Sequence, residues 1–303
     1  MYESKVYRWL LDVDPLWSTA VDEREPPKGA TSRWAQGEGA RTALDLLPPD
    51  ERARVLRFYR PIDAKLSLGS FLLKHRAIAT TCGIAWSEAL ISADSNKKPC
   101  HKPLDTEAKT LEFNVSHHGT LVALVGCAGT AVKLGVDIVR MNWEKDYATV
   151  MKDGFQAWAN IYEMVFSERE INDIAGFEPP LPSDPREKIR AQLRHFYSHW
   201  CLKEAYVKMN GEALLAPWLK DLEFRNVQVP MPNSQLQHGP QQDGDWGQTC
   251  TDVEIWFHGN RVSDVKLEIQ ALRDDYMVAT SSSNVDAFLS AFEELDLERN
   301  VLP

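Results

Sequence analysis

The segment WCLKEAYVKMNG, residues 200–211, places charged side chains in an apolar helical pattern. Its apolar residues would lie on nearly every side of a helix, which is typical of a helix inside a protein. Burying Lys203, Glu204 and Lys208 there is costly unless other groups compensate their charges. A half-buried carboxylate without an obvious arginine partner commonly binds a metal or acts as a base, so Glu204 is a candidate for either role.

A helix-stabilising ion pair is the simpler explanation of Glu204 and Lys208. The two residues are one turn apart, in the favourable Glu-then-Lys order. When exposed, such a pair contributes only about a few tenths of a kcal/mol. The spacing alone favours this explanation, whereas the apolar neighbours Tyr197 and Trp200 favour a functional role.

Asp137 is a second candidate carboxylate. It stands in GVDIV, where most strands would carry another apolar residue. It is either an aspartate at a strand end or edge, or a metal ligand. Two carboxylates from separate elements, completed by water and phosphate oxygens, are the usual way in which proteins hold Mg²⁺.

Ser116, His117 and His118 follow the predicted strand FNV. A serine hydrolase is disfavoured because adjacent residues on an extended chain point apart and no G-x-S-x-G motif occurs. The His-His pair also lacks the following aspartate of condensation-type acyltransferases. We favour a histidine that donates to phosphate oxygens. Lys97 and Lys98 add positive charge in a turn, and no glycine-rich phosphate loop is present.

A basic cluster interrupts an otherwise acidic chain. The net charge of −10 argues against a general affinity for nucleic acid. Between Glu51 and Arg76, however, the sequence contains seven basic residues and only two acidic ones. This cluster is either a solvated helix face or a pocket for a small anion such as a phosphate ester.

The composition is that of a globular protein, with 44% hydrophobic and 26% charged residues. The five cysteines form no C-x-x-C pair, which favours a reducing compartment. The N-terminus lacks the layout of a signal peptide, and the longest apolar run, 121–132, is shorter than the roughly 18 residues that span a bilayer. We expect a cytoplasmic protein without a membrane or nucleic-acid partner.

The pattern of apolar residues and turn formers predicts an α+β fold in two parts, each with helices and a small antiparallel sheet. Small residues near 127–135 predict the break, so the expected domains are 1–130 and 131–303. The expected helices cover 49–58, 64–80, 144–172, 186–209 and 285–297. A strand–turn–strand unit is expected at 111–128, and further strands within 133–141, 219–229, 252–258, 264–272 and 276–282. A polar insertion near 230–249 is expected to be a mobile surface segment.

Six segments in this order, RFYRPIDAKLSLGSFLLK, KKP, FNVSHHG, GVDIV, FSEREI and WCLKEAYVKMNG, resemble the Sfp-type 4′-phosphopantetheinyl transferases. The resemblance covers about residues 48–225, and the chain length and insertions are similar to those of fungal members from Aspergillus-like moulds. It implies a monomer of two similar α+β subdomains about a pseudo-twofold axis, with coenzyme A in the cleft between them. The implied activity is that of a holo-[acyl-carrier-protein] synthase, which transfers 4′-phosphopantetheine to a carrier serine.

The resemblance also implies roles for the candidate residues. Asp137 and Glu204 would bind Mg²⁺, or Mn²⁺, together with the pyrophosphate of coenzyme A, and Lys208 would neutralise phosphate charge. Glu204, or a water that it orients, would remove the proton of the attacking hydroxyl. Bacterial members carry a second acidic ligand where this chain has Val139. Glu170 of FSERE matches a further acidic position near the site.

Other residues match positions that bind the nucleotide. Arg54 and Lys98 would bind the 3′-phosphate, Ser67 would line the nucleotide site, and Ser116 and His117 would contact the phosphates. These assignments make the N-terminal part the coenzyme A phosphate-binding subdomain and the C-terminal part the metal and catalytic subdomain.

The implied partners are acyl and peptidyl carrier domains of fatty-acid, polyketide and non-ribosomal peptide synthases, and aminoadipate reductase in lysine biosynthesis. Family members engage carriers through the region that here reads DGFQAWANIYEMVF, in which Phe155, Trp158, Ile161 and Tyr162 share a helical face. That face is either core or a carrier contact, for which Phe155 and Trp158 are the candidates. Two other functions stay open, namely a binding module for coenzyme A or carriers without catalysis, and a metal-dependent phosphohydrolase.

Overall fold

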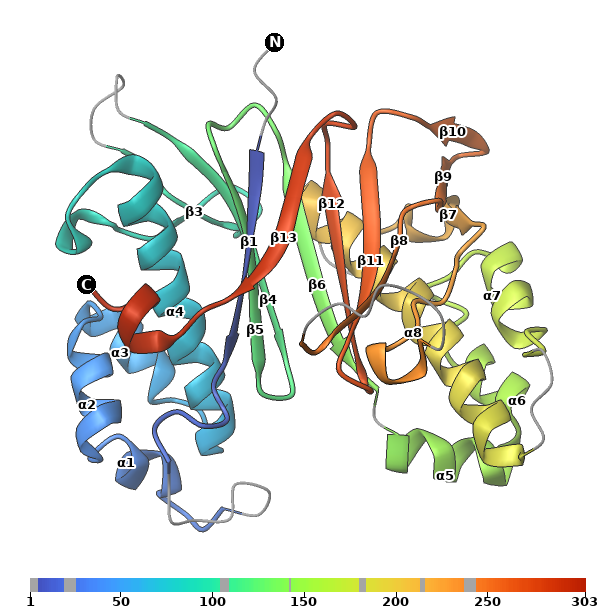
Figure 1. Ribbon diagram of the computed structural model, residues 1–303, viewed down its shortest axis with the longest axis horizontal. Coiled ribbons are helices and arrows are strands. Elements are labelled where there is room, and N and C mark those ends of the chain that lie inside the picture. Colours follow the sequence, from blue (N-terminus) through green and yellow to red (C-terminus); the bar gives the residue numbers. More distant parts are fainter. Residues whose placement is uncertain are drawn as a thin grey trace. The chain divides into compact units, whose positions relative to one another are not determined.

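The computed structural model describes residues 5–18, 26–103, 109–141, 143–179, 184–212, 216–236 and 244–303, and its fold is α+β (Figure 1). The chain divides into two compact units. Unit 1 comprises Met1–Val132 and Ala287–Pro303, and unit 2 comprises Lys133–Asp286. The expected boundary after residue 130 thus differs by two residues, and the C-terminal segment belongs to unit 1 because its strand pairs with the first strand.

Unit 1 is built on a four-stranded sheet in the order β13-β1-β5-β4. Its strands are β1 (Lys5–Asp12), β4 (Leu111–His118), β5 (Leu121–Ala128) and β13 (Phe288–Glu294). The strand β1 runs parallel to β13 and antiparallel to β5, so that the blue strand β1 and the red strand β13 lie side by side (Figure 1). The pair β4–β5 confirms the predicted strand–turn–strand unit. A short hairpin, β2 (Ser92–Ala93) and β3 (Pro99–Cys100), lies outside this sheet.

The long helix α4 (Pro61–Cys82) packs on β4 and β5. Its first residue is proline, which is tolerated where the backbone N–H has no helical partner, and it ends at Gly83, whose φ of 70° favours glycine. Gly69 permits the close approach to the sheet, since a Cβ there would lie 3.0 Å from a methyl of Val13. The other helical elements of unit 1 are α1 (Ala30–Trp34), α2 (Glu38–Asp45), α3 (Pro49–Val55), η1 (Trp86–Glu88) and the π-helix η4 (Leu297–Val301).

Unit 2 contains two antiparallel sheets, in the orders β6-β12-β11-β8 and β10-β9-β7. The strands are β6 (Leu134–Arg140), β7 (Leu222–Arg225), β8 (Trp246–Cys250), β9 (Glu254–Phe257), β10 (Asn260–Val262), β11 (Lys266–Leu272) and β12 (Tyr276–Ser282). Two short 3₁₀ turns, η2 (Leu219–Asp221) and η3 (Asn233–Gln235), precede β7 and β8 respectively. The expected strands at 133–141, 219–229, 252–258, 264–272 and 276–282 each contain one of these strands, so those predictions are confirmed.

The helix α8 (Pro185–Asn210) crosses the larger sheet of unit 2 and contacts β6, β12 and β11 (Figure 1). It begins at Asp184, whose side chain accepts from the backbone N–H of Arg186, and it ends at Gly211 in the left-handed region. This confirms the helix expected at 186–209. The continuous helix expected at 144–172 is wrong, because Gly154, with φ of 84°, interrupts it. The segment contains α5 (Trp143–Asp153), α6 (Phe155–Asn160) and the start of α7 (Glu168–Ala175).

The helix expected at 285–297 is also wrong. The sequence AFEEL is rich in helix formers, but the segment forms β13 because the edge of β1 offers a ladder of hydrogen bonds to it. The polar insertion near 230–249 contributes η3 and the edge strand β8, and its centre, 237–243, lies outside the described residues.

Each unit has its own apolar core. In unit 1 the core forms between the sheet and the helices, and in unit 2 two clusters form around α8. Across the part of the chain that the structure describes, no helix combines the length and the apolar character that crossing a membrane requires.

Candidate active site

Three charged side chains predicted to act together meet in unit 2, where α8 crosses β6. Gly135 on β6 makes this crossing close, since a Cβ there would lie 2.1 Å from the carbonyl oxygen of Ala205. Side chains alternate along a strand, so Asp137 lies on the same face of β6 as Gly135 and meets α8. The Nζ of Lys208 donates to the Oδ1 of Asp137 at 2.6 Å. Gly135 thus allows α8 to approach β6 closely, and this approach brings Lys208 within hydrogen-bonding distance of Asp137.

Glu204 completes this group, one helical turn before Lys208. Burial and the nearby charge of Asp137 raise the pKa of Glu204 to about 7, although the Lys208 ammonium opposes the rise. Burial lowers the pKa of Lys208, but attraction from Asp137 and Glu204 outweighs burial and leaves it raised. Two carboxylates that repel each other, with only one ammonium nearby, are stabilised when a further cation binds.

The donor set fits Mg²⁺. Carboxylate oxygens are the ligands that this ion prefers, and it usually takes one or two of them and completes its shell with water and phosphate oxygens. Val139 is buried in the apolar cluster with Cys201 and Leu202, so it supplies no ligand atom. Asp137 and Glu204 are therefore the two residues of this group that could hold the ion.

A separate cavity of about 390 Å³ lies in unit 1. Its lining residues come from α3, α4, β4 and the segment after α3: Arg54, Arg57, Phe58, Ser67, Ser70, Phe71, Lys74 and His117. Three of the predicted nucleotide contacts, Arg54, Ser67 and His117, thus line one cavity. Two others do not: the Nζ of Lys98 pairs with Glu112 at 2.5 Å, and Ser116 is buried on β4.

The cavity concentrates positive charge against a ring. The Nζ of Lys74 lies 4.1 Å from the centre of the Phe71 ring, and the guanidinium of Arg54 lies 5.4 Å from it. Burial lowers the pKa of Lys74 to about 8, with Arg54 adding to the effect and Glu51 opposing it. Cations held close together in a buried place favour an anion as ligand. A sulfate-like or phosphate group is the chemistry that this cavity would take.

Sequence reasoning missed Lys74 as an individual residue, although it counted Lys74 within the basic cluster. Ser67, Phe71 and Lys74 follow one another at i, i+4 and i+7 along α4, so helical spacing from Ser67 could have identified the lysine. A buried hydrogen bond holds α3 against α4 here, since the Oε2 of Glu51 lies 2.7 Å from the Nε2 of His75.

Two family models match the chain. Residues 33–129 match "4′-phosphopantetheinyl transferase, N-terminal", and residues 133–259 match the "4′-phosphopantetheinyl transferase superfamily". A 4′-phosphopantetheinyl transferase of Aureobasidium melanogenum is 35% identical over 339 residues, which cover 97% of this chain and 96% of the relative. The chain belongs to the 4′-phosphopantetheinyl transferase family. The predicted resemblance is confirmed, and with it the enzyme class: a transferase that activates carrier proteins.

Further relatives come from fungi and animals. The 4′-phosphopantetheinyl transferase A of Aspergillus fumigatus is 33% identical over 86% of this chain and 88% of its own length. The L-aminoadipate-semialdehyde dehydrogenase-phosphopantetheinyl transferase of Homo sapiens is 21% identical over 80% of this chain and 69% of its own. The two family models fall in different units, one in unit 1 and one in unit 2.

Lys203, next to Glu204, has a structural role in this transferase. Its ammonium lies 2.6 Å from the Oε2 of Glu170 and also donates to three backbone carbonyls, and neither side chain is exposed. Glu170 accepts in addition from the N–H groups of Ser167 and Phe224. The pair therefore fastens α7, α8 and β7 to one another, which gives Glu170 of FSERE a structural role.

Of the two alternatives for Phe155 and Trp158, core or carrier contact, their burial favours the core. Both are buried, at 8% and 3% exposure, in the cluster that α6 forms with α8. The Trp158 ring lies 4.6 Å from that of Phe196 on α8. Ile161 on the same expected face is 67% exposed.

Proposed function

We propose that this transferase uses Asp137, Glu204 and Lys208 to move 4′-phosphopantetheine from coenzyme A to the serine hydroxyl of acyl and peptidyl carrier domains. The serine oxygen forms a bond to the phosphorus that carries the pantetheine group. The bond from that phosphorus to the bridging oxygen breaks, and 3′,5′-ADP leaves. The single observation that carries this proposal is the group of two mutually repelling carboxylates and one ammonium where α8 crosses β6.

In the proposal Asp137 and Lys208 have one role each, and Glu204 has two. Asp137 and Glu204 hold Mg²⁺, which when bound would neutralise the diphosphate and polarise the bond that breaks. Lys208 turns from Asp137 to a phosphate oxygen and neutralises its charge. Glu204, directly or through a water molecule, takes the proton of the serine hydroxyl. Measuring transfer with Mg²⁺ and with Mn²⁺ would show which of the two ions the enzyme prefers.

The cavity of unit 1 is proposed to bind the 3′-phosphate of coenzyme A. Arg54, Lys74 and His117 donate to the phosphate oxygens, and Ser67 lines the nucleotide site. Lys98 stays a predicted 3′-phosphate contact. Its ammonium, which pairs with Glu112, would leave that carboxylate to bind the phosphate. Ser116 also stays a predicted phosphate contact.

The acceptors are proposed to be carrier domains of fatty-acid, polyketide and non-ribosomal peptide synthases, and aminoadipate reductase. Aminoadipate reductase as an acceptor is supported by the human relative, which is named an L-aminoadipate-semialdehyde dehydrogenase-phosphopantetheinyl transferase. Because Phe155 and Trp158 are buried, we propose instead that Ile161 and Met164, which are 67% and 70% exposed, supply the apolar carrier contact. A monomeric, cytoplasmic enzyme with pseudo-twofold symmetry stays a prediction.

Intact-mass measurement of a carrier protein tests the activity. The chain is incubated with coenzyme A, Mg²⁺ and an apo carrier, and we expect the carrier to gain one phosphopantetheine group. The variants Asp137→Asn and Glu204→Gln should lose the product, whereas Asp221→Asn, which removes an exposed charge of unit 2, should retain it. Phosphate release without a carrier would indicate a phosphohydrolase. Binding of coenzyme A with no change in either reactant would indicate a binding module, and either result would overturn the proposal.

A further inference from the structure

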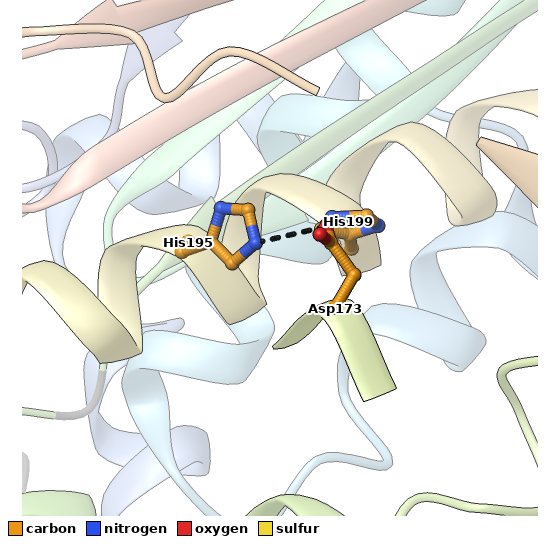
Figure 2. A group of neighbouring side chains, drawn as sticks. All are labelled: Asp173, His195 and His199. Atoms are coloured by element: carbon orange, nitrogen blue, oxygen red, sulfur yellow. Dashed lines mark ion pairs between the residues drawn. The ribbon is translucent and has the colours of Figure 1, made fainter. Parts of the chain in front are cut away.

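Two buried histidines on α8 have no part in the proposed reaction. His195 and His199 are one helical turn apart, so that both rings lie on one face, and their exposures are 4% and 0%. Asp173 on α7 points toward both rings (Figure 2). These three residues belong to unit 2, and none of them contacts Asp137, Glu204 or Lys208 in any recorded hydrogen bond or ion pair.

The histidine rings lack ordinary hydrogen bonds. Among the described residues, no partner with acceptable geometry meets any of their four ring nitrogens. The nearest polar atom is the Oδ2 of Asp173, at 3.3 Å from the Nε2 of His195 and 3.4 Å from that of His199. Both separations exceed the roughly 2.7–3.2 Å of N–H···O hydrogen bonds. A buried polar atom without a partner costs free energy, so such a pair of rings calls for an explanation.

Aromatic rings surround the two imidazoles. The ring of Phe177 stacks on His195 with centres 4.2 Å apart, and the ring of Phe166 meets His199 edge-on. These apolar neighbours offer no hydrogen-bonding atoms.

The spacing of the three groups fits a metal ion. Around a tetrahedral ion with bonds of about 2.0–2.1 Å, neighbouring ligand atoms lie roughly 3.3–3.4 Å apart. The two distances between Asp173 and the histidines have these values. One ligand atom from each of the three residues lies within 4.8 Å of the other two. Two histidines at i and i+4 on one helix are a common way to hold such an ion.

We propose that Asp173, His195 and His199 form a binding site for a transition-metal dication of the zinc class. Imidazole nitrogens suit Zn²⁺, Co²⁺ and Ni²⁺, whereas Mg²⁺ prefers oxygen ligands, so the site is chemically distinct from the carboxylates of the reaction. The Asp173 side chain is 62% exposed, which gives the ion access and leaves a fourth position for water.

Metal binding here would join α7 to α8. The same two helices are already joined by Glu170 and Lys203, which lie next to the catalytic part of α8. A ligand that binds only the folded state raises the melting temperature as its concentration rises. The melting temperature of the whole chain should therefore increase with the Zn²⁺ concentration.

Cobalt titration of the full chain tests the proposal. After treatment with a chelator, the protein is titrated with Co²⁺ and the visible d–d absorption is followed, with Zn²⁺ added afterwards as a competitor. We expect one equivalent of Co²⁺ in a four-coordinate spectrum without thiolate charge-transfer bands. His195→Gln and His199→Gln should weaken binding by at least the roughly ten- to hundredfold that loss of a supporting group costs.

Two further variants keep the test decisive. Asp173→Asn changes an exposed side chain, so it should fold normally and still weaken Co²⁺ binding at least tenfold, by the same reasoning. His258→Gln is the matched control, because His258 has an aspartate, Asp221, at 3.4 Å but forms no three-residue cluster with the described residues. It should bind Co²⁺ as the unaltered chain does. Failure of the unaltered chain to bind one equivalent, or equal binding by Asp173→Asn, would overturn the proposal. Neither result bears on the proposed transfer reaction with Mg²⁺, because these three residues have no part in it.

Discussion

Replacement of Lys203 by methionine should destabilise unit 2 far more than it impairs chemistry. The Lys203 ammonium is completely buried and makes four contacts, the shortest of which is 2.6 Å to Glu170. Methionine fills a similar volume but leaves the Glu170 carboxylate buried without its cation. Removal of one partner from a buried ion pair costs about 3–5 kcal/mol. Urea unfolding followed by circular dichroism should show a loss of this size in Lys203→Met.

Two comparisons distinguish the lost ion pair from a loss of packing. The double variant Lys203→Met/Glu170→Gln removes both charges and keeps an acceptor for the Phe224 N–H, so it should recover part of the lost stability. Lys208→Met removes a 27% exposed cation from the same helix, and it should lower kcat strongly while costing less stability. A loss below about 1 kcal/mol in Lys203→Met, or a double variant no more stable than the single one, would refute the reasoning.

Three other outcomes follow from the site. Glu204→Gln should lower metal-dependent transfer by about a thousandfold, as for other groups that act on the transition state, and leave the circular dichroism spectrum unchanged; near-normal turnover would contradict the assignment. The pKa of Lys74 is about 8, so its ammonium loses a proton as the pH rises through 8, and the KM for coenzyme A should rise over that range. Lys74→Met should raise the KM for coenzyme A roughly ten- to hundredfold and abolish this pH dependence. The KM for 3′-dephospho-coenzyme A should change little. Ile161→Asp or Met164→Asp should raise the KM for the carrier at an unchanged melting temperature, whereas Phe155→Ala should cost about 3–5 kcal/mol of stability; the reverse pattern would return the carrier contact to the buried face.

The elements that carry a strong local signal were predictable from the sequence. The turn between β4 and β5, the β-branched run of β6 and the apolar pattern of α8 each depend on neighbours within a few residues. The segment 288–294 is different, because its helix formers are overruled by pairing with β1, almost the whole chain length away. No local pattern reports on a partner so distant in sequence.

The candidate site was predictable where the motif and the packing agree. Asp137 was identified within GVDIV, and the structure gives a reason for the glycine of that segment, since a Cβ at Gly135 would collide with the backbone of α8. Phe155 and Trp158 show the opposite case. An apolar helical face is equally suited to a core and to a protein partner, and the burial that decides between them depends on where α8 lies.

The charges of WCLKEAYVKMNG divide by helical geometry. Successive residues of a helix point about 100° apart, and residues four apart share a face. Lys203 consequently points to Glu170, away from the face that Glu204 and Lys208 present toward β6. The buried pair fixes the rotation of α8 beside the very residue that must meet Asp137. A shift of α8 by one residue would move Glu204 off that face and place the Lys203 charge in the apolar core without its partner, so the structural lysine also helps to position the proposed catalytic carboxylate.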